Sequence, residues 1–297
     1  MMTIPKKPAE PQFLQSREHG SGETRPSPAG FKLSKVYDPT LESPKHRLER
    51  RVYREANVSG FSHVDQEIAF FTQVAALLRP TDVLLDFGAG RGEFMDQDPS
   101  EFRRRLQNFR GRCEHVDGCD PDPVVLENPT VDAAQVIEAG KALPYEDNRF
   151  DIVVARYVFE HIENPQRVAQ ELLRVVKPGG WICAMTPNKW GYVALASRLL
   201  PNRAHSQALI HVQPGRQACD VFPTRYRLNR PSAVKRYFGH AADVYWYSTS
   251  AVPSYHFGNI FVMRILQVVH RLTPTPFDVG LRFFIRKRDE GGIPGAD

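Results

Sequence analysis

The chain of 297 residues has only four cysteines and no long apolar run. The cysteines show neither the paired spacing of a metal site nor the pattern of a disulfide framework, which excludes a small disulfide-stapled fold. The longest stretch without a charged residue, 244–263, mixes Tyr, Ser, Thr, His, Asn, Pro and Gly, so no transmembrane segment is expected. The N-terminal residues have no apolar stretch behind their charges and do not resemble a secretory signal. These absences predict a cytoplasmic protein in a reducing compartment.

Charge is nearly balanced overall but is distributed unevenly. The chain holds 39 Lys and Arg against 34 Asp and Glu, which gives a formal net charge of +5. Hydrophobic residues make up 41% and charged residues 25%, as in ordinary soluble globular proteins. This composition excludes a collagen-like, coiled-coil or wholly disordered chain.

The N-terminal segment 1–44 holds seven prolines and little apolar surface to bury. It is predicted to be a disordered or loosely attached tail. A single domain is then expected over 45–297, beginning with a basic helix at 45–56 whose charged side chains face solvent.

Helices and strands alternate after this point. Ser62 is predicted to cap a helix that ends before Arg79-Pro80. Asn164-Pro165 is predicted to begin a second helix, which Lys177-Pro178-Gly179-Gly180 stops. Strands are expected at 83–87, 115–119, 134–138, 150–155, 181–186, 242–248 and 280–287, and further helices at about 99–109 and 260–272. This alternation predicts an α/β fold with a mainly parallel sheet that helices cover on both faces.

A glycine cluster in VLLDFGAGRGEF, residues 83–94, is the central functional signal. Asp86 ends an apolar strand, and Gly88, Gly90 and Gly92 follow it. Glycines permit positive φ angles and let a ligand approach the backbone closely. The spacing differs from the dinucleotide fingerprint, in which the third glycine falls one residue later. A tight turn without any ligand is the alternative interpretation.

Asp120 is the second signal, because it ends the next strand. Ligands in open α/β sheets lie beyond the carboxyl ends of the strands. A carboxylate there can accept hydrogen bonds from two ribose hydroxyls. A turn residue within CDPDP is the alternative.

The run LPYEDNRFDIVVARYVFEHIENPQRVAQELLRVVKPGGWICAMTPN, residues 143–188, completes the pattern. Together with DFGAGRG, it closely resembles class I S-adenosylmethionine-dependent methyltransferases of the type 11 family, over about 62–188. The resemblance implies a Rossmann-like, doubly wound, mostly parallel seven-stranded sheet with an antiparallel strand near the C-terminus. It also implies S-adenosyl-L-methionine as the cofactor.

The resemblance assigns cofactor contacts residue by residue. The glycine motif would cradle the methionine part, the residues after the second strand would bind the ribose, and Arg156 would line the cavity of the methyl donor. The stretch touching adenine departs from the family, since Ala139 stands where many members have an acid and Glu138 lies beside it. The full expected cofactor set is Asp86, Phe87, Gly88, Gly90, Gly92, Asp120, Pro121, Glu138 and Arg156.

Glu160-His161 matches a glutamate-histidine pair of the family. Metal-dependent relatives use a Glu-x-x-Glu-His ligand set, but Tyr157 occupies its first position here, so no metal is expected. A structural role is favoured over metal binding, and a role for His161 as general base stays open. The catalytic candidates are His161, His205 and His211 as bases, and Tyr226 as a group that positions the acceptor.

The segment 187–242 breaks the strand–helix pattern and is predicted to be a basic substrate lid. It holds nine Lys or Arg and one acid, Asp220. This charge predicts a small anionic or glycan-like acceptor, bound in part by Arg225 and Arg227, with a solvated basic loop as the alternative. Nucleic acid is the less favoured partner, although the mixture of Arg and Tyr in 223–231 keeps RNA methylation open.

The sequence leaves three questions open. The helix 260–272 is amphipathic and could touch a membrane surface or a dimer partner, but packing on the sheet is favoured because the helix links two predicted strands. The oligomeric state is not predicted. A cofactor-binding scaffold that has lost catalysis is the alternative to an active methyltransferase.

Overall fold

The computed structural model describes residues 37–192, 194, 223–253, 256 and 258–289. The chain divides into two compact units, Met1–Leu33 and Ser34–Asp297, and the described residues all belong to the second unit. Most of the predicted tail, residues 1–36, therefore lies outside the described residues. Tyr37 forms an isolated antiparallel bridge with Ser100, and the guanidinium of Arg50 lies 4.5 Å from the centre of its ring.

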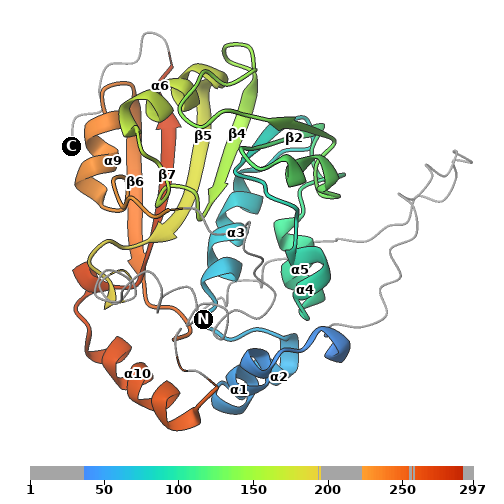
Figure 1. The fold of residues 1–297 in the computed structure, drawn as a ribbon, viewed down its shortest axis with the longest axis vertical. Coiled ribbons are helices and arrows are strands. Elements are labelled where there is room, and N and C mark those ends of the chain that lie inside the picture. Colours follow the sequence, from blue (N-terminus) through green and yellow to red (C-terminus); the bar gives the residue numbers. More distant parts are fainter. Residues whose placement is uncertain (1–36, 193, 195–222, 254–255, 257, 290–297) are drawn as a thin grey trace, which may run out of the picture. The chain divides into compact units, whose positions relative to one another are not determined.

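Seven strands form one sheet in the order β3-β2-β1-β4-β5-β7-β6 (Figure 1). The strands are β1 (Val83–Phe87), β2 (His115–Asp120), β3 (Ala133–Val136), β4 (Phe150–Arg156), β5 (Val176–Pro187), β6 (Ala242–Thr249) and β7 (Gly280–Lys287). The first five run parallel, and β7 pairs antiparallel with both β5 and β6. The predicted Rossmann-like sheet with an antiparallel strand near the C-terminus is confirmed. From β1 the chain adds β2 and β3 on one side, and it then crosses to add β4 and β5 on the other side. The boundary between β1 and β4 is therefore the switch point at which ligands bind in such folds.

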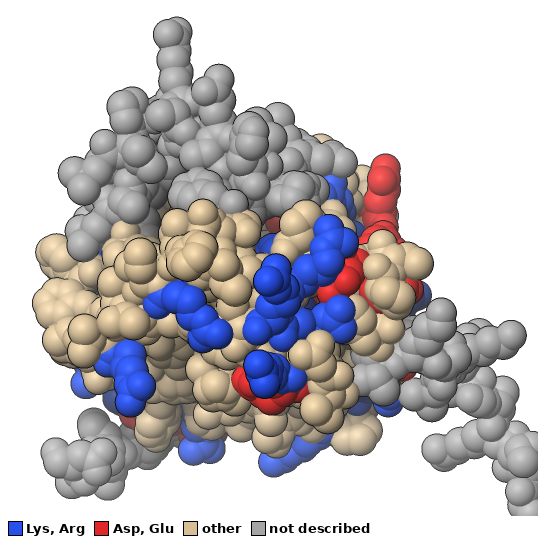
Figure 2. Space-filling model, turned by 90° about the horizontal axis from the view of Figure 1, so that it is seen from below, with Lys and Arg blue, Asp and Glu red and all other residues tan. Residues whose placement is uncertain are grey.

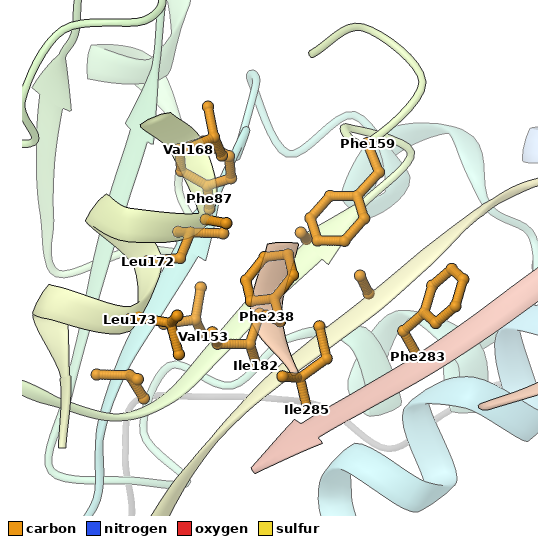
Figure 3. Close-up of a cluster of buried hydrophobic side chains, with 14 of the residues drawn as sticks. Phe87, Val153, Phe159, Val168, Leu172, Leu173, Ile182, Phe238, Phe283 and Ile285 are labelled. Atoms are coloured by element: carbon orange, nitrogen blue, oxygen red, sulfur yellow. The ribbon is translucent and has the colours of Figure 1, made fainter. Parts of the chain in front are cut away.

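Helices cover both faces of the sheet, and each face has its own apolar core. The described helices are α1 (Pro44–Val52), α2 (Ala56–Ser59), α3 (Gln66–Leu77), α4 (Phe94–Gln97), α5 (Glu101–Gln107), α6 (Pro165–Val175), α9 (Pro231–Phe238) and α10 (Ile260–Leu272), with 3-10 turns η1 (Pro39–Leu41), η2 (Pro123–Glu127) and η4 (Thr275–Phe277). Residues of α6 and α9 pack on one face, where Leu172 and Phe238 approach the strand residues Val153 and Ile182 (Figure 3). Residues of α3 and α5 fill the other face.

The helix α3 begins at Gln66, later than predicted, because Asp65 and not Ser62 is its cap. The Asp65 carboxylate accepts hydrogen bonds from the backbone N–H groups of Glu67 and Ile68, at 2.9 and 3.0 Å. Two unpaired donors of the first turn are thereby satisfied. The prediction of Ser62 as the cap was wrong, since the Ser62 side chain is buried and its hydroxyl makes no such bond.

The strand β5 begins five residues earlier than predicted. Phe150 of β4 pairs with Val176, and the register then shifts so that Ile152 pairs with Trp181. The extra residues form a bulge, which Gly179 permits by taking a φ of +74°. The Lys-Pro-Gly-Gly sequence therefore lies within β5, after α6 has ended at Val175.

The helix α10 has the predicted bounds, but the prediction that it packs on the sheet was wrong. Its Met263 is fully buried against Leu48 and Val52 of α1, and Figure 1 shows α10 beside α1 and α2 rather than on the sheet. The reason is topological: β6 and β7 are antiparallel neighbours, so their connection need not cross a sheet face as a parallel crossover must. None of the described helices is long and apolar enough to cross a membrane.

Candidate functional site

The carboxyl ends of β1, β2 and β4 bring the predicted cofactor residues to one edge of the sheet. Asp86 of β1 stands in register with Gly118 of β2 and with Val154 of β4. The glycine loop, Asp120 and Arg156 follow directly after those positions on their own strands. The site thus lies at the switch point of the sheet.

The three glycines of the loop have positive φ angles but different surroundings. A Cβ atom added to Gly88 would lie 2.3 Å from Val158 Cγ2, and one added to Gly92 would lie 2.5 Å from Asn128 Oδ1. A Cβ atom on Gly90 would meet nothing closer than Glu93 Oε2 at 4.0 Å. The outer two glycines are therefore required by packing inside the chain, whereas Gly90 borders open space.

Asp120 is joined directly to this loop. Its carboxylate accepts a hydrogen bond from Gly90 N–H at 3.0 Å through one oxygen and from Asp122 N–H at 2.8 Å through the other. The Asn128 amide donates to the carbonyls of Ala89 and Gly90, at 3.0 and 3.1 Å. Each oxygen of Asp120 keeps a further lone pair that can accept a bond from a ligand hydroxyl. Sequence reasoning missed Asn128, which no motif marks.

The site is rich in carboxylates. Burial, together with the neighbouring Asp120 and Glu93, raises the pKa of Asp86 to about 7, although Arg156 opposes the shift. Burial also raises the pKa of Asp120, against the backbone hydrogen bonds from Asp122 and Gly90. Both shifts mean that burial and neighbouring carboxylates disfavour the charged form of these groups.

Arg156 is a partly buried cation of this cluster. Its Nη2 lies 3.4 Å from Glu67 Oε1, and its Nε is buried without a hydrogen-bond partner. Burial alone would lower the pKa of Arg156, but the carboxylates of Glu67, Glu93 and Asp86 raise it above its ordinary value, as does Tyr157. Three carboxylates, those of Glu67, Glu93 and Asp86, thus act on this guanidinium.

A buried polar network holds the start of α3 against the ends of β4 and β7. The Gln66 amide donates to the Tyr157 hydroxyl at 2.9 Å, and Arg282 Nη2 donates to Gln66 Oε1 at 2.6 Å. Tyr157 has a positive φ of 55°, and burial, with Glu67, raises its pKa, so its hydroxyl stays neutral. Sequence reasoning missed Gln66 and Arg282, which are separated by 216 positions.

The Glu160-His161 pair makes hydrogen bonds to β5 and to residues 223–226. Glu160 is buried and accepts a bond from the Thr186 hydroxyl at 2.8 Å, while its carbonyl accepts from the N–H groups of Arg225 and Tyr226. His161 Nδ1 lies 3.3 Å from the carbonyl oxygen of Pro223. These contacts agree with the structural interpretation of the pair. Across the described ranges, no group of three or more His, Cys, Asp or Glu is placed to hold a metal ion.

The remaining cofactor candidates differ in what they offer. Phe87 is buried in the core, so only its backbone can face a ligand. Pro121 is exposed at the end of β2, and Glu138 is exposed and lies 3.6 Å from Lys141 after β3. The cofactor assignments of all three stay predictions.

The remaining catalytic and acceptor candidates lie within the predicted lid, residues 187–242. His205 and His211 lie outside the described residues. The Tyr226 side chain is buried, and its backbone has a positive φ of 52°. Arg225 and Arg227 are exposed, and both contact Glu163. Arg225 Nη2 lies 3.7 Å from the Glu163 carboxylate, and Arg227 Nη1 donates to the Glu163 carbonyl. Glu163 was not among the predicted residues.

Comparison with known proteins agrees with this geometry. Residues 61–223 match the family described as "Methyltransferase domain". An uncharacterized methyltransferase of Mycolicibacterium vanbaalenii is 30% identical over 148 residues, which are 48% of this chain and 50% of that protein. Another, of Mycobacterium leprae (strain TN), is 29% identical over 191 residues, 59% of this chain and 62% of that protein. The chain thus spans only about half the length of the curated relatives it matches.

Similar solved structures include two methyltransferases. A SAM-dependent methyltransferase from Aquifex aeolicus has a TM-score of 0.42 and 12% identity, covering 83% of this chain and 99% of that one. One from Methanosarcina mazei has a TM-score of 0.44 and 15% identity, covering 73% and 97%.

The chain belongs to the S-adenosylmethionine-dependent methyltransferase family. The resemblance predicted from the motifs is thereby confirmed, and the family implies S-adenosylmethionine as the cofactor.

Proposed function

We propose that the chain transfers a methyl group from S-adenosylmethionine to a hydroxyl or amine of a small anionic, glycan-like acceptor in the cytoplasm. One observation carries the cofactor part: the open backbone at Gly90 is hydrogen-bonded to Asp120. A glycine that a ligand can approach and an acid that can accept from ribose hydroxyls are thus adjacent. Family membership supports the reaction type.

The residues present fit this cofactor. The neighbouring carboxylates Asp86, Asp120 and Glu93 complement its sulfonium and ammonium charges. Asp86 and the glycine loop would hold the methionine part, and Asp120 the ribose. The sulfonium supplies an already activated methyl group, so the chain's main task is to orient the acceptor.

The acceptor part rests on charge and position. Arg225 and Arg227 are exposed and lie beside Glu163, in the loop that follows β4. Guanidinium groups there favour an acceptor with phosphate or carboxylate groups. A hydroxyl or amine acceptor also needs a base near neutral pKa, for which His161, His205 and His211 stay the candidates.

The test has a binding arm and a transfer arm. Calorimetry with S-adenosylmethionine should show binding that Gly90→Arg and Asp120→Ala abolish; absence of binding at millimolar cofactor would refute the cofactor assignment. Methyl-labelled cofactor, incubated with fractions of a metabolite extract, should label an anionic fraction. Arg225→Ala and Arg227→Ala should raise the KM for that acceptor without changing cofactor affinity, and Arg236→Ala, an exposed arginine of α9, should change neither.

Other outcomes would point to the alternatives. Cofactor binding without transfer to any fraction would favour a catalytically silent scaffold. Methyl incorporation into RNA, with binding that weakens steeply as salt rises, would favour an RNA methyltransferase.

A further inference from the structure

The helix α10 has a stripe of apolar side chains that are exposed to solvent. The stripe consists of Phe261, Ile265, Val268 and Leu272, whose exposed fractions are 78%, 63%, 56% and 75%. These positions recur every three or four residues and therefore lie on one face of the helix. Large apolar side chains that are this exposed along a whole helix mark an interaction surface rather than a stray surface residue.

Contacts on the opposite face fix this orientation. Met263 is fully buried with Leu48 and Val52 of α1, and His270, seven residues later, is nearly buried. His270 Nδ1 hydrogen-bonds the Ala251 carbonyl at 3.0 Å. At 3.6 residues per turn, positions 263 and 270 lie about half a turn from the stripe. The helix is thus amphipathic, but it is anchored by the side opposite its exposed apolar stripe.

A basic hollow lies on the neighbouring helix. Four arginines of α1 and the residues just after it line an open depression of about 510 Å³ together with Asn57: Arg47, Arg50, Arg51 and Arg54. Arg50 is paired with Glu42 at 2.7 Å, and the other three arginines are exposed. Figure 2 views this face of the molecule and shows Lys and Arg side chains gathered beside a mostly uncharged area.

Charge on α10 reinforces the pattern. The helix contains no Asp or Glu, and its Arg264 and Arg271 border the stripe on one side. A helix with Phe and Leu on one face and basic residues beside them is the kind that lies in the plane of a bilayer interface, with its apolar face among the acyl chains. Clustered arginines next to such a helix attract anionic lipid headgroups.

We propose that the stripe of α10 and the arginine hollow of α1 together dock the chain on an anionic lipid bilayer surface. The two features match the two layers of such a surface, acyl chains and phosphates. A second copy is a poorer occupant, because a symmetric dimer through this face would bring both arginine clusters toward one another. A polyanion such as RNA would engage the hollow but would leave the apolar stripe in water.

The helix α10 lies at the same edge of the sheet as the cofactor candidates (Figure 1). Tyr192, five residues after β5 ends, packs on His270 of α10 with ring centroids 5.1 Å apart. The surface therefore lies near the carboxyl end of β5, and β1, β2 and β4 carry the cofactor candidates at the same edge. Docking would set that edge close to the membrane.

Vesicle flotation with the full chain tests the proposal. We expect flotation with vesicles of phosphatidylcholine and phosphatidylglycerol, and little with phosphatidylcholine alone. Arg47→Gln with Arg51→Gln should weaken binding about 25-fold, because each basic residue near an anionic surface contributes about fivefold. Phe261→Ser with Leu272→Ser should weaken it at least as much, since acyl contact is lost.

Matched controls separate this surface from charge and hydrophobicity in general. Lys235→Gln with Arg236→Gln on α9 removes two exposed charges elsewhere, and Leu126→Ser removes a leucine that is 62% exposed on η2. Both controls should float like the unaltered chain. Circular dichroism and cofactor binding of each variant confirm that it is folded, and they keep the result independent of the methyl-transfer proposal.

Three results would overturn the proposal. The first is absence of flotation with anionic vesicles. The second is flotation that the arginine variant abolishes but the apolar variant leaves unchanged, which would show a general polyanion site. The third is a dimer in light scattering that Phe261→Ser with Leu272→Ser converts to a monomer, without vesicle binding by either form, which would assign the stripe to a second copy.

Discussion

Asp86 is expected to couple cofactor binding to pH. Burial and the neighbouring carboxylates raise its pKa to about 7 from an ordinary value of 3.8. A cationic ligand beside it favours the ionised form, so binding releases a proton wherever the free site still holds one. The affinity for S-adenosylmethionine should therefore rise as the pH rises through 7.

The size of the effect follows from the ionised fraction. With a pKa of about 7, roughly one tenth of the sites carry ionised Asp86 at pH 6 and roughly nine tenths at pH 8. If the ligand requires the ionised form, its affinity should improve about tenfold over this interval, or about 1.4 kcal/mol. The stability of the folded chain changes with pH in the opposite direction. The raised pKa favours the folded state below the ordinary value of 3.8, and that advantage is lost as the pH rises through about 7.

Calorimetry between pH 5.5 and 8.5 on the unaltered chain and on Asp86→Asn provides the assay. The ligand's own amino group also titrates in this range, so the ratio of the two affinities at each pH is the informative quantity. The variant should keep the low affinity that the unaltered chain shows at acid pH, and the ratio should grow about tenfold from pH 6 to pH 8. A ratio that stays constant across this range would refute the coupling.

Three substitutions separate packing from ligand contact. Gly88→Ala should lower the free energy of unfolding by more than about 2 kcal/mol in urea denaturation, because its Cβ would lie 2.3 Å from Val158 Cγ2 at a positive φ. Gly90→Ala should cost only about 1 kcal/mol of stability but should weaken cofactor binding at least about tenfold in calorimetry; unchanged affinity would contradict a ligand at that backbone. Glu160→Ala should cost about 1–3 kcal/mol, because the buried Thr186 hydroxyl loses its acceptor, and full stability with lost turnover would instead make Glu160 catalytic.

The architecture could be predicted because it rests on local patterns. The bounds of β1, β7 and α10 coincide with those expected, since each combines a clear apolar pattern with definite end signals. At α10, Asn259 caps the helix through bonds from the N–H groups of Phe261 and Val262. Where two cap candidates compete, as Ser62 and Asp65 do, the sequence does not show which side chain turns toward the free N–H groups.

The cofactor edge could be predicted for a different reason. Parallel strands end at one edge, so residues that end neighbouring strands must meet there, as Gly90 and Asp120 do. The link between Gln66, Tyr157 and Arg282 has no such rule behind it. Arg282 is a charged residue, which composition alone would place near solvent, yet it is fully buried and bonded to the first residue of α3. Only the packing of α3 against the sheet creates that contact.

The orientation of α10 shows what periodicity leaves open. A repeat every three or four residues establishes that a helix has an apolar face, but it does not say whether that face turns toward the protein. Here the buried positions Met263 and His270 lie opposite the stripe, so the described core does not need the stripe's apolar side chains. Apolar residues that stay exposed to water add no hydrophobic stabilisation to the folded chain alone. A partner that removes them from water supplies that stabilisation, and the arginines beside them favour a partner whose apolar layer is bordered by phosphates.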